Sequence, residues 1–277
     1  MSEFLIKKAS KQAKKLKMGI SAPSGHGKTY GALLIAYGIT GDWSKITVID
    51  TERGSSNIYS ELGEFNVLDL NAPYSPERFI ECITLCEKSG TDVIVLDSSS
   101  HEWSGSGGCL DIQQQLGGKF TDWKTVTPRH NAFIDKVLRS TCHVICTTRK
   151  KQGYAIEGSK PIKLGLEDVQ RDGFEYELDV MFNIENNKHL ASISKDRTNL
   201  FTNTPEFLIT EETGKLLKNW ASKGRSEIDD ALDLVRQSTT IEQLNGIYTN
   251  YLSLQTNSDF VSALRARRAI ITESQTN

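Results

Sequence analysis

Short apolar runs alternate with amphipathic segments along the first 200 residues of the chain. The apolar runs predict strands at 18–21, 46–49, 66–70, 92–97 and 143–147. The segments between them predict helices at 29–37, 76–87 and 125–138. Because strands alternate with helices, the sequence predicts an α/β fold with a mainly parallel sheet flanked by helices.

The pattern changes after Gly173. Apolar runs at 178–184 and 190–194 are separated by the turn-rich residues 185–188, which predicts an antiparallel hairpin. A helix is expected at 211–220 and a linker at 221–224, and only helical periodicity follows from 226 to 273. We therefore predict three parts: a basic N-terminal segment at 1–16, an α/β core at 17–222, and a small all-helical domain at 225–277.

Composition narrows the class of protein. The 277 residues are 25% charged and 38% apolar, which is typical of folded globular proteins and argues against disordered, collagen-like and coiled-coil chains. No stretch approaches the ~18 uncharged apolar residues of a membrane helix, and the N-terminus has no apolar secretory region. We expect a soluble protein without membrane contact, located in the cytoplasm.

The net charge of −2 conceals two basic segments. Residues 1–17 hold six lysines and one glutamate, and residues 149–163 hold five cations and one glutamate. Such segments can contact a polyanion, although solvated surface lysines are an equally ordinary interpretation.

The five cysteines do not have the spacing of a zinc site. Cys82 and Cys86 are four residues apart, as are Cys142 and Cys146, and neither pair has a matching histidine pair. We expect buried, reduced thiols.

The strongest motif follows the first strand and opens the first helix. It comprises Ala22, Pro23, Ser24, Gly25, His26, Gly27, Lys28 and Thr29, with Tyr30 directly after it. The glycines allow the backbone to bend so that N–H groups face a phosphate, and the helix N-terminus adds partial positive charge. In a loop of this kind Lys28 reaches the β- and γ-phosphates and the Thr29 hydroxyl binds Mg²⁺. The motif predicts a nucleoside triphosphate site.

A second carboxylate supports this prediction. Asp97 ends the apolar run 93–96, as in a Walker B strand, where the aspartate orients the magnesium shell. Together the two motifs predict binding of a nucleoside triphosphate with Mg²⁺.

A glutamate stands at the end of the second strand. Glu52 follows Ile49-Asp50-Thr51, at the edge of the sheet where α/β proteins bind ligands, and could deprotonate an attacking water. Glu102, five residues after Asp97, is an alternative base.

These residues resemble the RecA-type recombination ATPases. In that family an Ile-Asp-x-Glu supplies the catalytic glutamate and an Ile-Tyr shortly afterwards supplies a tyrosine that stacks on adenine. The resemblance implies that Glu52 is catalytic, that Tyr59 contacts adenine, and that the nucleotide is ATP. It also implies that Lys195 and Arg197 reach the γ-phosphate of a neighbouring subunit, so that the protein self-associates into a ring or filament.

The same resemblance implies a DNA-contacting loop at 149–165. The candidate single-stranded DNA contacts there are Arg149, Lys150, Lys151, Tyr154, Lys160 and Lys163. Cations would engage phosphates and the tyrosine could stack on a base. A glycine-rich stretch at 104–118 is a candidate second mobile loop beside it, and a lid without a role in DNA binding is an equally good interpretation.

The chain is most similar to small phage-encoded RecA-like ATPases of the single-strand annealing and recombination type. That resemblance implies a phage protein that acts on single-stranded DNA in recombination, annealing or replication in the bacterial cytoplasm, with ATP held at a subunit interface. Two alternatives stay open: a hexameric helicase or translocase, and a nucleotide-gated loader that recruits a partner, such as a single-strand-binding protein, through its C-terminal helices.

Overall fold

The computed structural model describes residues 11–157, 160–224 and 226–276, and it gives the backbone alone for 154–157, 160–164 and 273–276. The chain divides into two compact units. One is residues 15–220, and the other combines residues 1–14 with residues 221–277.

The larger unit contains the sheet. Its strands are β1 (Lys17–Ala22), β2 (Ile46–Asp50), β3 (Asn66–Asp69), β4 (Val93–Asp97), β5 (His143–Glu157), β6 (Lys160–Asp168), β7 (Val180–Ile184), β8 (Leu190–Asp196) and β9 (Phe207–Leu208). They lie in the order β3-β2-β4-β5-β1-β7-β8-β9, with β6 paired to β5 outside this path. The strands from β3 to β7 in this order run parallel, and β8 and β9 add an antiparallel edge. The predicted α/β fold class is confirmed.

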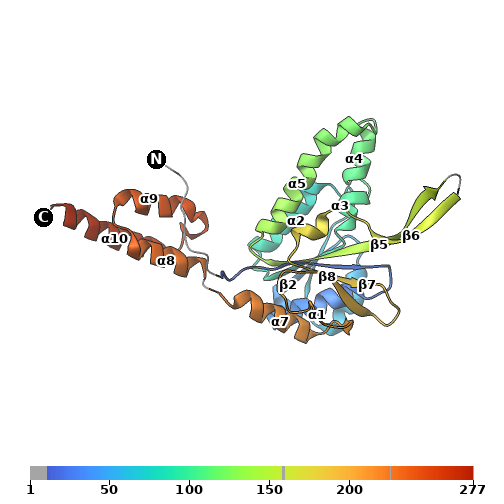
Figure 1. The fold of residues 1–277 in the computed structure, drawn as a ribbon, viewed down its shortest axis with the longest axis horizontal. Helices are drawn as coiled ribbons and strands as arrows, with labels where there is room; N and C mark the ends of the chain where they lie inside the picture. Colours follow the sequence, from blue (N-terminus) through green and yellow to red (C-terminus); the bar gives the residue numbers. More distant parts are fainter. Residues whose placement is uncertain (1–10, 158–159, 225, 277) are drawn as a thin grey trace. The chain divides into compact units, whose positions relative to one another are not determined.

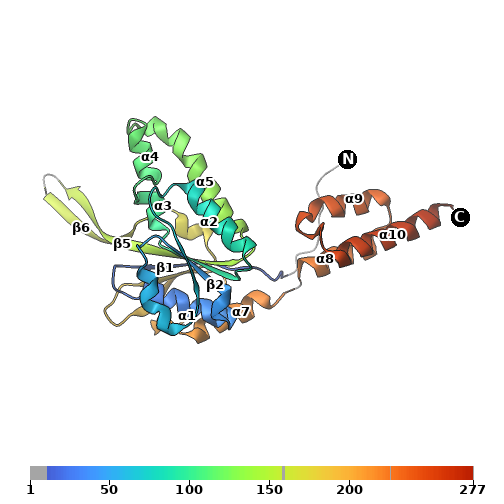
Figure 2. The same cartoon turned by 180° about the vertical axis from the view of Figure 1, so that it is seen from behind.

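Helices cover both faces of this sheet. They are α1 (Lys28–Thr40), α2 (Pro76–Lys88), α3 (Ser100–Ser104), α4 (Cys109–Gln115), α5 (Trp123–Arg139), α6 (Phe174–Glu177) and α7 (Glu211–Ser222), with short 3-10 turns η1 (Trp43–Lys45), η2 (Ser55–Leu62) and η3 (Phe120–Asp122). Figures 1 and 2 show α2 to α5 on one face and α1 and α7 on the other. On the first face the rings of Phe79 and Phe133 pack 5.5 Å apart inside the core.

The two regions expected as glycine-rich or basic loops have regular structure instead. β5 continues past the sheet and pairs with β6 in a long antiparallel hairpin, where residues 149–165 were expected to be a loop. We call residues 150–157 and 160–168 the arm (Figure 1). Residues 104–118 contain α4, whose N-terminus follows Gly108. Glycines at 105, 107 and 108 made this short helix hard to predict, because glycine has a low helix propensity. Glycine does not prevent a helix that begins directly after it.

One of the N-terminal lysines is part of the core. Lys17 is buried, and its ammonium group donates hydrogen bonds to the carbonyls of Ser140 (2.8 Å) and Cys142 (2.5 Å). Burial lowers its pKa to about 8. The interpretation of Lys17 as part of a basic surface segment was therefore wrong. Lys11, Lys14 and Lys15 are exposed, and Lys7 and Lys8 lie outside the described residues.

The smaller unit is helical, as the periodicity predicted. It contains α8 (Glu227–Gln237), α9 (Ile241–Asn250), η4 (Leu252–Leu254) and α10 (Ser258–Thr276). Ser226 and Thr240 form capping boxes at the starts of α8 and α9, which explains where these helices begin. The unit has its own apolar core around Phe260. Among the described residues no helix is both long and apolar enough to cross a membrane.

Helices α1 and α7 approach each other through two glycines. A Cβ atom on Gly38 would stand 2.1 Å from the carbonyl oxygen of Glu211, and one on Gly214 would stand 2.2 Å from the carbonyl oxygen of Ile35. Both obstacles are backbone atoms, which cannot rotate away as a side chain can. The contact therefore requires glycine on both helices.

We predict that Gly38→Ala lowers the free energy of unfolding by about 1–3 kcal/mol, because the helices must separate. Thermal or urea denaturation measures the loss. Gly246→Ala is the matched control: it lies within α9 with open space around it, and should be neutral or stabilising by less than about 1 kcal/mol. Equal losses in the two variants would contradict the packing argument.

Candidate nucleotide site

Four adjacent parallel strands, β2, β4, β5 and β1, end at the same edge of the sheet. The glycine-rich loop follows β1, Glu52 follows β2, Asp97 ends β4, and Arg149 lies on β5 opposite Ala22 of β1. Residues that are distant in the sequence therefore meet at one edge.

The loop after β1 has the backbone of a phosphate-binding loop. Gly25 and Gly27 have φ values of 80° and 83°, a left-handed conformation that strongly favours glycine. Gly27 caps α1, which begins at Lys28, so the first N–H groups of the helix face the loop. An anion placed there would meet backbone donors and the positive end of the helix dipole.

Asp97 lies at the centre of this edge and is fully buried. One carboxylate oxygen accepts a hydrogen bond from the Thr29 hydroxyl and the other from the Thr147 hydroxyl, each at 2.6 Å. Burial raises the pKa of Asp97, and the two hydroxyl bonds oppose this shift. The carboxylate is thus held directly beside the first turn of α1.

The donor set beside Asp97 fits a hard divalent cation. Thr29 and Asp97 offer oxygen ligands, as Mg²⁺ prefers. The neighbouring Ser98 hydroxyl is buried and has no hydrogen-bond partner in the described part of the chain. An unsatisfied buried hydroxyl is costly unless a further group, such as a water of the metal shell, bonds to it.

Asp50 shapes the loop that carries Glu52. Its buried carboxylate accepts hydrogen bonds from the N–H groups of Glu52 (2.6 Å), Gly54 (3.3 Å) and Ser56 (2.9 Å), and from the Ser56 hydroxyl (2.6 Å). One side chain therefore fixes the backbone over five residues after β2. Ser56 is itself fully buried.

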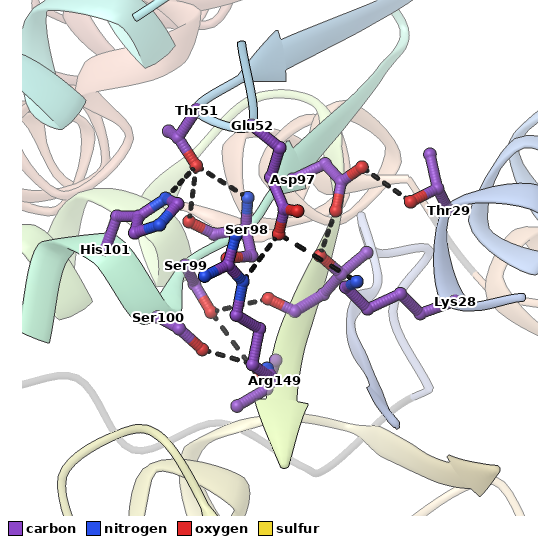
Figure 3. A network of polar contacts seen from close by, with 12 residues as sticks. Lys28, Thr29, Thr51, Glu52, Asp97, Ser98, Ser99, Ser100, His101 and Arg149 are labelled. Atoms are coloured by element: carbon purple, nitrogen blue, oxygen red, sulfur yellow. Dashed lines mark hydrogen bonds and ion pairs between the residues drawn. The ribbon is translucent and has the colours of Figure 1, made fainter. Parts of the chain in front are cut away.

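Glu52 projects from this loop toward two cations (Figure 3). Its Oε1 accepts a hydrogen bond from Arg149 Nε at 2.8 Å and lies 3.8 Å from Lys28 Nζ. Burial alone would raise the pKa of Glu52, but the Arg149 hydrogen bond and the Lys28 charge outweigh it and the pKa is lowered. Glu52 is therefore ionised and restrained by an ion pair.

Arg149, a candidate DNA contact, lies beside Glu52 at the candidate nucleotide site, and a contact of Arg149 with DNA stays a prediction. Its guanidinium group faces Glu52, and its backbone N–H donates to the Ser100 hydroxyl at 2.9 Å. The next residue, Lys150, faces the opposite way and pairs with Asp168 (2.9 Å) and Glu185 (3.1 Å). Alternation along a strand explains why two adjacent cations have unrelated partners.

A threonine ties the ends of β2 and β4 together. The Thr51 hydroxyl accepts from the N–H of Ser98 at 2.8 Å and lies 2.6 Å from His101 Nδ1. The His101 ring stacks on Tyr74 with centroids 4.8 Å apart. Figure 3 shows this network beside Glu52 and Arg149. It holds the loop after β4 in place behind the site.

A pocket of about 430 Å³ adjoins the loop. Tyr30 and Tyr59 line it with ring centroids 5.9 Å apart, opposite the apolar side chains of Ile184, Leu208 and Ile209. His26 also lies at this pocket. Tyr59 therefore lies where a base could stack, beside the ring of Tyr30.

Lys195 and Arg197 lie near the amino ends of the parallel strands, whereas the phosphate loop lies at their carboxyl ends. Lys195 is paired in register with Met181, near the start of β7, whereas the phosphate loop follows the end of the parallel strand β1. Lys195 donates to the carbonyls of Glu175 (3.1 Å) and Tyr176, and Arg197 donates to the carbonyl of Tyr176 (3.0 Å). They do not reach the phosphate loop of their own chain, and action on a neighbouring subunit stays a prediction.

The candidate DNA contacts are divided. Lys151 is exposed on the arm, whereas the side chain of Lys150 is only 8% exposed and engaged in its two ion pairs. The side chains of Tyr154, Lys160 and Lys163 lie outside the described residues.

Glu102, the alternative base, is completely buried on α3. Its carboxylate binds His130 and Cys109 and does not face Lys28. The geometry therefore favours Glu52 over Glu102 beside the phosphate loop.

The sequence motifs missed Asp50, Thr51, Thr147 and Arg149 as parts of this site. A signal was present for each, because all four lie at the ends of predicted strands, where ligands bind in α/β sheets.

One known protein family matches most of the chain. A family described as "AAA domain" (AAA_24) matches residues 14–243. No curated protein matches the sequence. A solved structure of a KaiC-like protein from the hyperthermophilic archaeon Pyrococcus horikoshii is similar at 15% identity, with a TM-score of 0.38, over 66% of this chain and 80% of that chain. Since the family match spans most of its length, the chain belongs to the AAA domain family AAA_24 and has the fold of a P-loop ATPase.

Proposed function

We propose that this protein is a Mg²⁺-dependent ATPase whose hydrolysis is coupled to single-stranded DNA, with a role in phage recombination or annealing. The observation that carries the ATPase proposal is the meeting of the Lys28 loop, the Thr29–Asp97 pair and the Glu52 carboxylate at one edge of the sheet. These groups are the ones that phosphoryl transfer to water requires.

Each group has a distinct task. The backbone of the loop and Lys28 bind the phosphates, and the Tyr30–Tyr59 pocket receives the base. Thr29 and Asp97 would hold Mg²⁺, which neutralises charge on the phosphates when bound. Glu52 orients the attacking water and accepts its proton.

The ion pair with Arg149 makes Glu52 a weaker base when no nucleotide is bound. A general base works best when its pKa lies near the operating pH, and Arg149 lowers the pKa of Glu52. A γ-phosphate close to Lys28 offers Arg149 a stronger anionic partner than one carboxylate. Transfer of Arg149 to that phosphate would release Glu52 for catalysis.

We predict that Lys28→Ala abolishes ATP binding and hydrolysis, while Glu52→Gln keeps ATP binding and lowers kcat by about 10²–10⁴-fold. Steady-state phosphate release and a fluorescent-nucleotide titration measure the two effects. Glu102→Gln should bind ATP as the wild type does. Full hydrolysis by Glu52→Gln would contradict the assignment of the base.

A second prediction concerns pH. The profile of kcat/KM reports ionisations of the free enzyme, in which Arg149 lowers the pKa of Glu52. The rate falls as Glu52 becomes protonated, so the acidic limb lies at low pH in the wild type. In Arg149→Ala the pKa of Glu52 rises, and this limb should move to higher pH. An unmoved limb would show that the ion pair does not act on the base.

The arm supports the proposal of DNA coupling. Both of its strands are tied to the nucleotide site at their base: Arg149 precedes it on β5 and binds Glu52, while Asp168 on β6 accepts from the Ser21 hydroxyl of β1 at 2.5 Å. A ligand that moves the arm therefore acts on the catalytic glutamate and on the strand that carries the phosphate loop. The lysines of the arm at 151, 160 and 163 favour a polyanion as that ligand.

We predict that single-stranded DNA stimulates ATP hydrolysis and that stimulation fades with added salt, because phosphate contacts release counterions. Lys151→Ala should keep the basal rate and reduce the salt slope of DNA binding by about one. Lys88→Ala, an exposed lysine at the end of α2, is the matched control. Hydrolysis indifferent to DNA would instead favour a nucleotide-gated loader acting through the C-terminal helices.

A further inference from the structure

Three side chains of metal-ligand type meet inside the helical layer that covers one face of the sheet. Glu102 lies on α3, Cys109 begins α4, and His130 lies on α5. Glu102 Oε1 is 3.1 Å from Cys109 Sγ and 3.0 Å from His130 Nδ1. One donor atom from each residue lies within 4.8 Å of the other two.

All three side chains of this cluster are buried, which is unusual for a group that includes a carboxylate. Glu102 and Cys109 are 0% exposed and His130 is 3% exposed. Among the described residues no lysine or arginine forms an ion pair with Glu102. Its one ionisable partner of opposite charge there is His130, which is positive only when protonated. A permanent positive partner at this buried carboxylate would therefore stabilise the fold.

We propose that Glu102, Cys109 and His130 bind one Zn²⁺ ion. The set of one oxygen, one sulfur and one nitrogen donor suits this borderline cation, whereas Mg²⁺ prefers oxygen ligands alone. A zinc ion about 2.0 Å from the oxygen and nitrogen and about 2.3 Å from the sulfur would lengthen the two distances from Glu102 Oε1, to Cys109 Sγ and to His130 Nδ1, by a few tenths of an ångström. The fourth position, which these three residues leave open, would hold a water molecule.

Charge and protons balance in this site. In the metal-free cluster the Cys109 thiol donates to Glu102, and burial together with the Glu102 charge raises the pKa of that thiol. Zinc binding replaces the thiol proton, which passes to solvent. It also displaces the proton that His130 Nδ1 donates to Glu102, and Nε2 takes up a proton from solvent, so that a neutral His130 ligates through Nδ1. One thiolate and one carboxylate then neutralise the 2+ charge of the ion.

The position of the site gives the ion a structural task. α3 has 5 residues and α4 has 7, too few for either helix to be stable alone. One ion would link both helices to the longer α5. The Trp103 ring packs edge-on against His130 at 5.4 Å and stacks on Trp123, so metal binding has a fluorescence signal nearby.

Titration of the full chain with Co²⁺, a spectroscopic substitute for zinc, tests the proposal. We expect binding of one equivalent with a thiolate-to-cobalt charge-transfer band, a change in tryptophan fluorescence, and loss of the band when Zn²⁺ is added. Zn²⁺ alone should raise the Tm. The phosphate loop contains no cysteine, so Co²⁺ bound in place of Mg²⁺ there cannot produce this band.

Variants assign the band to the cluster. Cys109→Ser should lose it, while Cys82→Ser, the matched control at a partly exposed thiol on α2, should keep it. If circular dichroism shows that Cys109→Ser is unfolded, His130→Asn takes its place and should bind Co²⁺ at least about tenfold more weakly. No band in the wild type, a band retained in folded Cys109→Ser, or undiminished affinity in His130→Asn would overturn the proposal.

Discussion

The parallel alignment of β2, β4, β5 and β1 is the constraint on which the nucleotide site depends. Parallel strands require crossover helices, and these bring every carboxyl end to the same edge. Asp97 occupies the centre of that edge and bonds Thr29 from the P-loop helix and Thr147 from β5. The buried carboxylate thus links β4 to β5 and to helix α1, and displacing either partner would leave one of its oxygens without its hydrogen bond.

Glu52 is held in place by its backbone and by two cations. Asp50 fixes the loop by accepting from three backbone N–H groups, so that the position of Glu52 is set before a nucleotide arrives. Arg149 and Lys28 then neutralise the carboxylate. Both cations lie beside the phosphate loop, where an anion would meet them. The same two cations restrain the glutamate.

Local patterns predicted most of the fold, because strand periodicity, glycine turns and capping residues act over a few positions. The phosphate loop and Asp97 were identified for the same reason. The loop has its glycines and lysine at a fixed spacing between a strand and a helix, and Asp97 ends an apolar run. The direction of Arg149 and the ion pairs of Lys150 depend on the register of β5 against β1 and β6, which is set by tertiary pairing. The Glu102–Cys109–His130 cluster joins three helices across 29 residues, so no spacing rule could have revealed it.

The continuous course of β5 has a mechanical consequence. Its first residues lie fixed between β4 and β1, and residues 150–157 project from the sheet for about 26 Å at the usual rise of a strand. If this strand turns about Arg149 as a rigid body, the displacement of each atom grows with its distance from Arg149. A turn that moves the tip by several ångströms moves the atoms next to Arg149 by a fraction of an ångström, which is enough to lengthen its 2.8 Å hydrogen bond to Glu52. In the opposite direction, a small movement of the strand next to Arg149 becomes a large displacement of the tip of the arm.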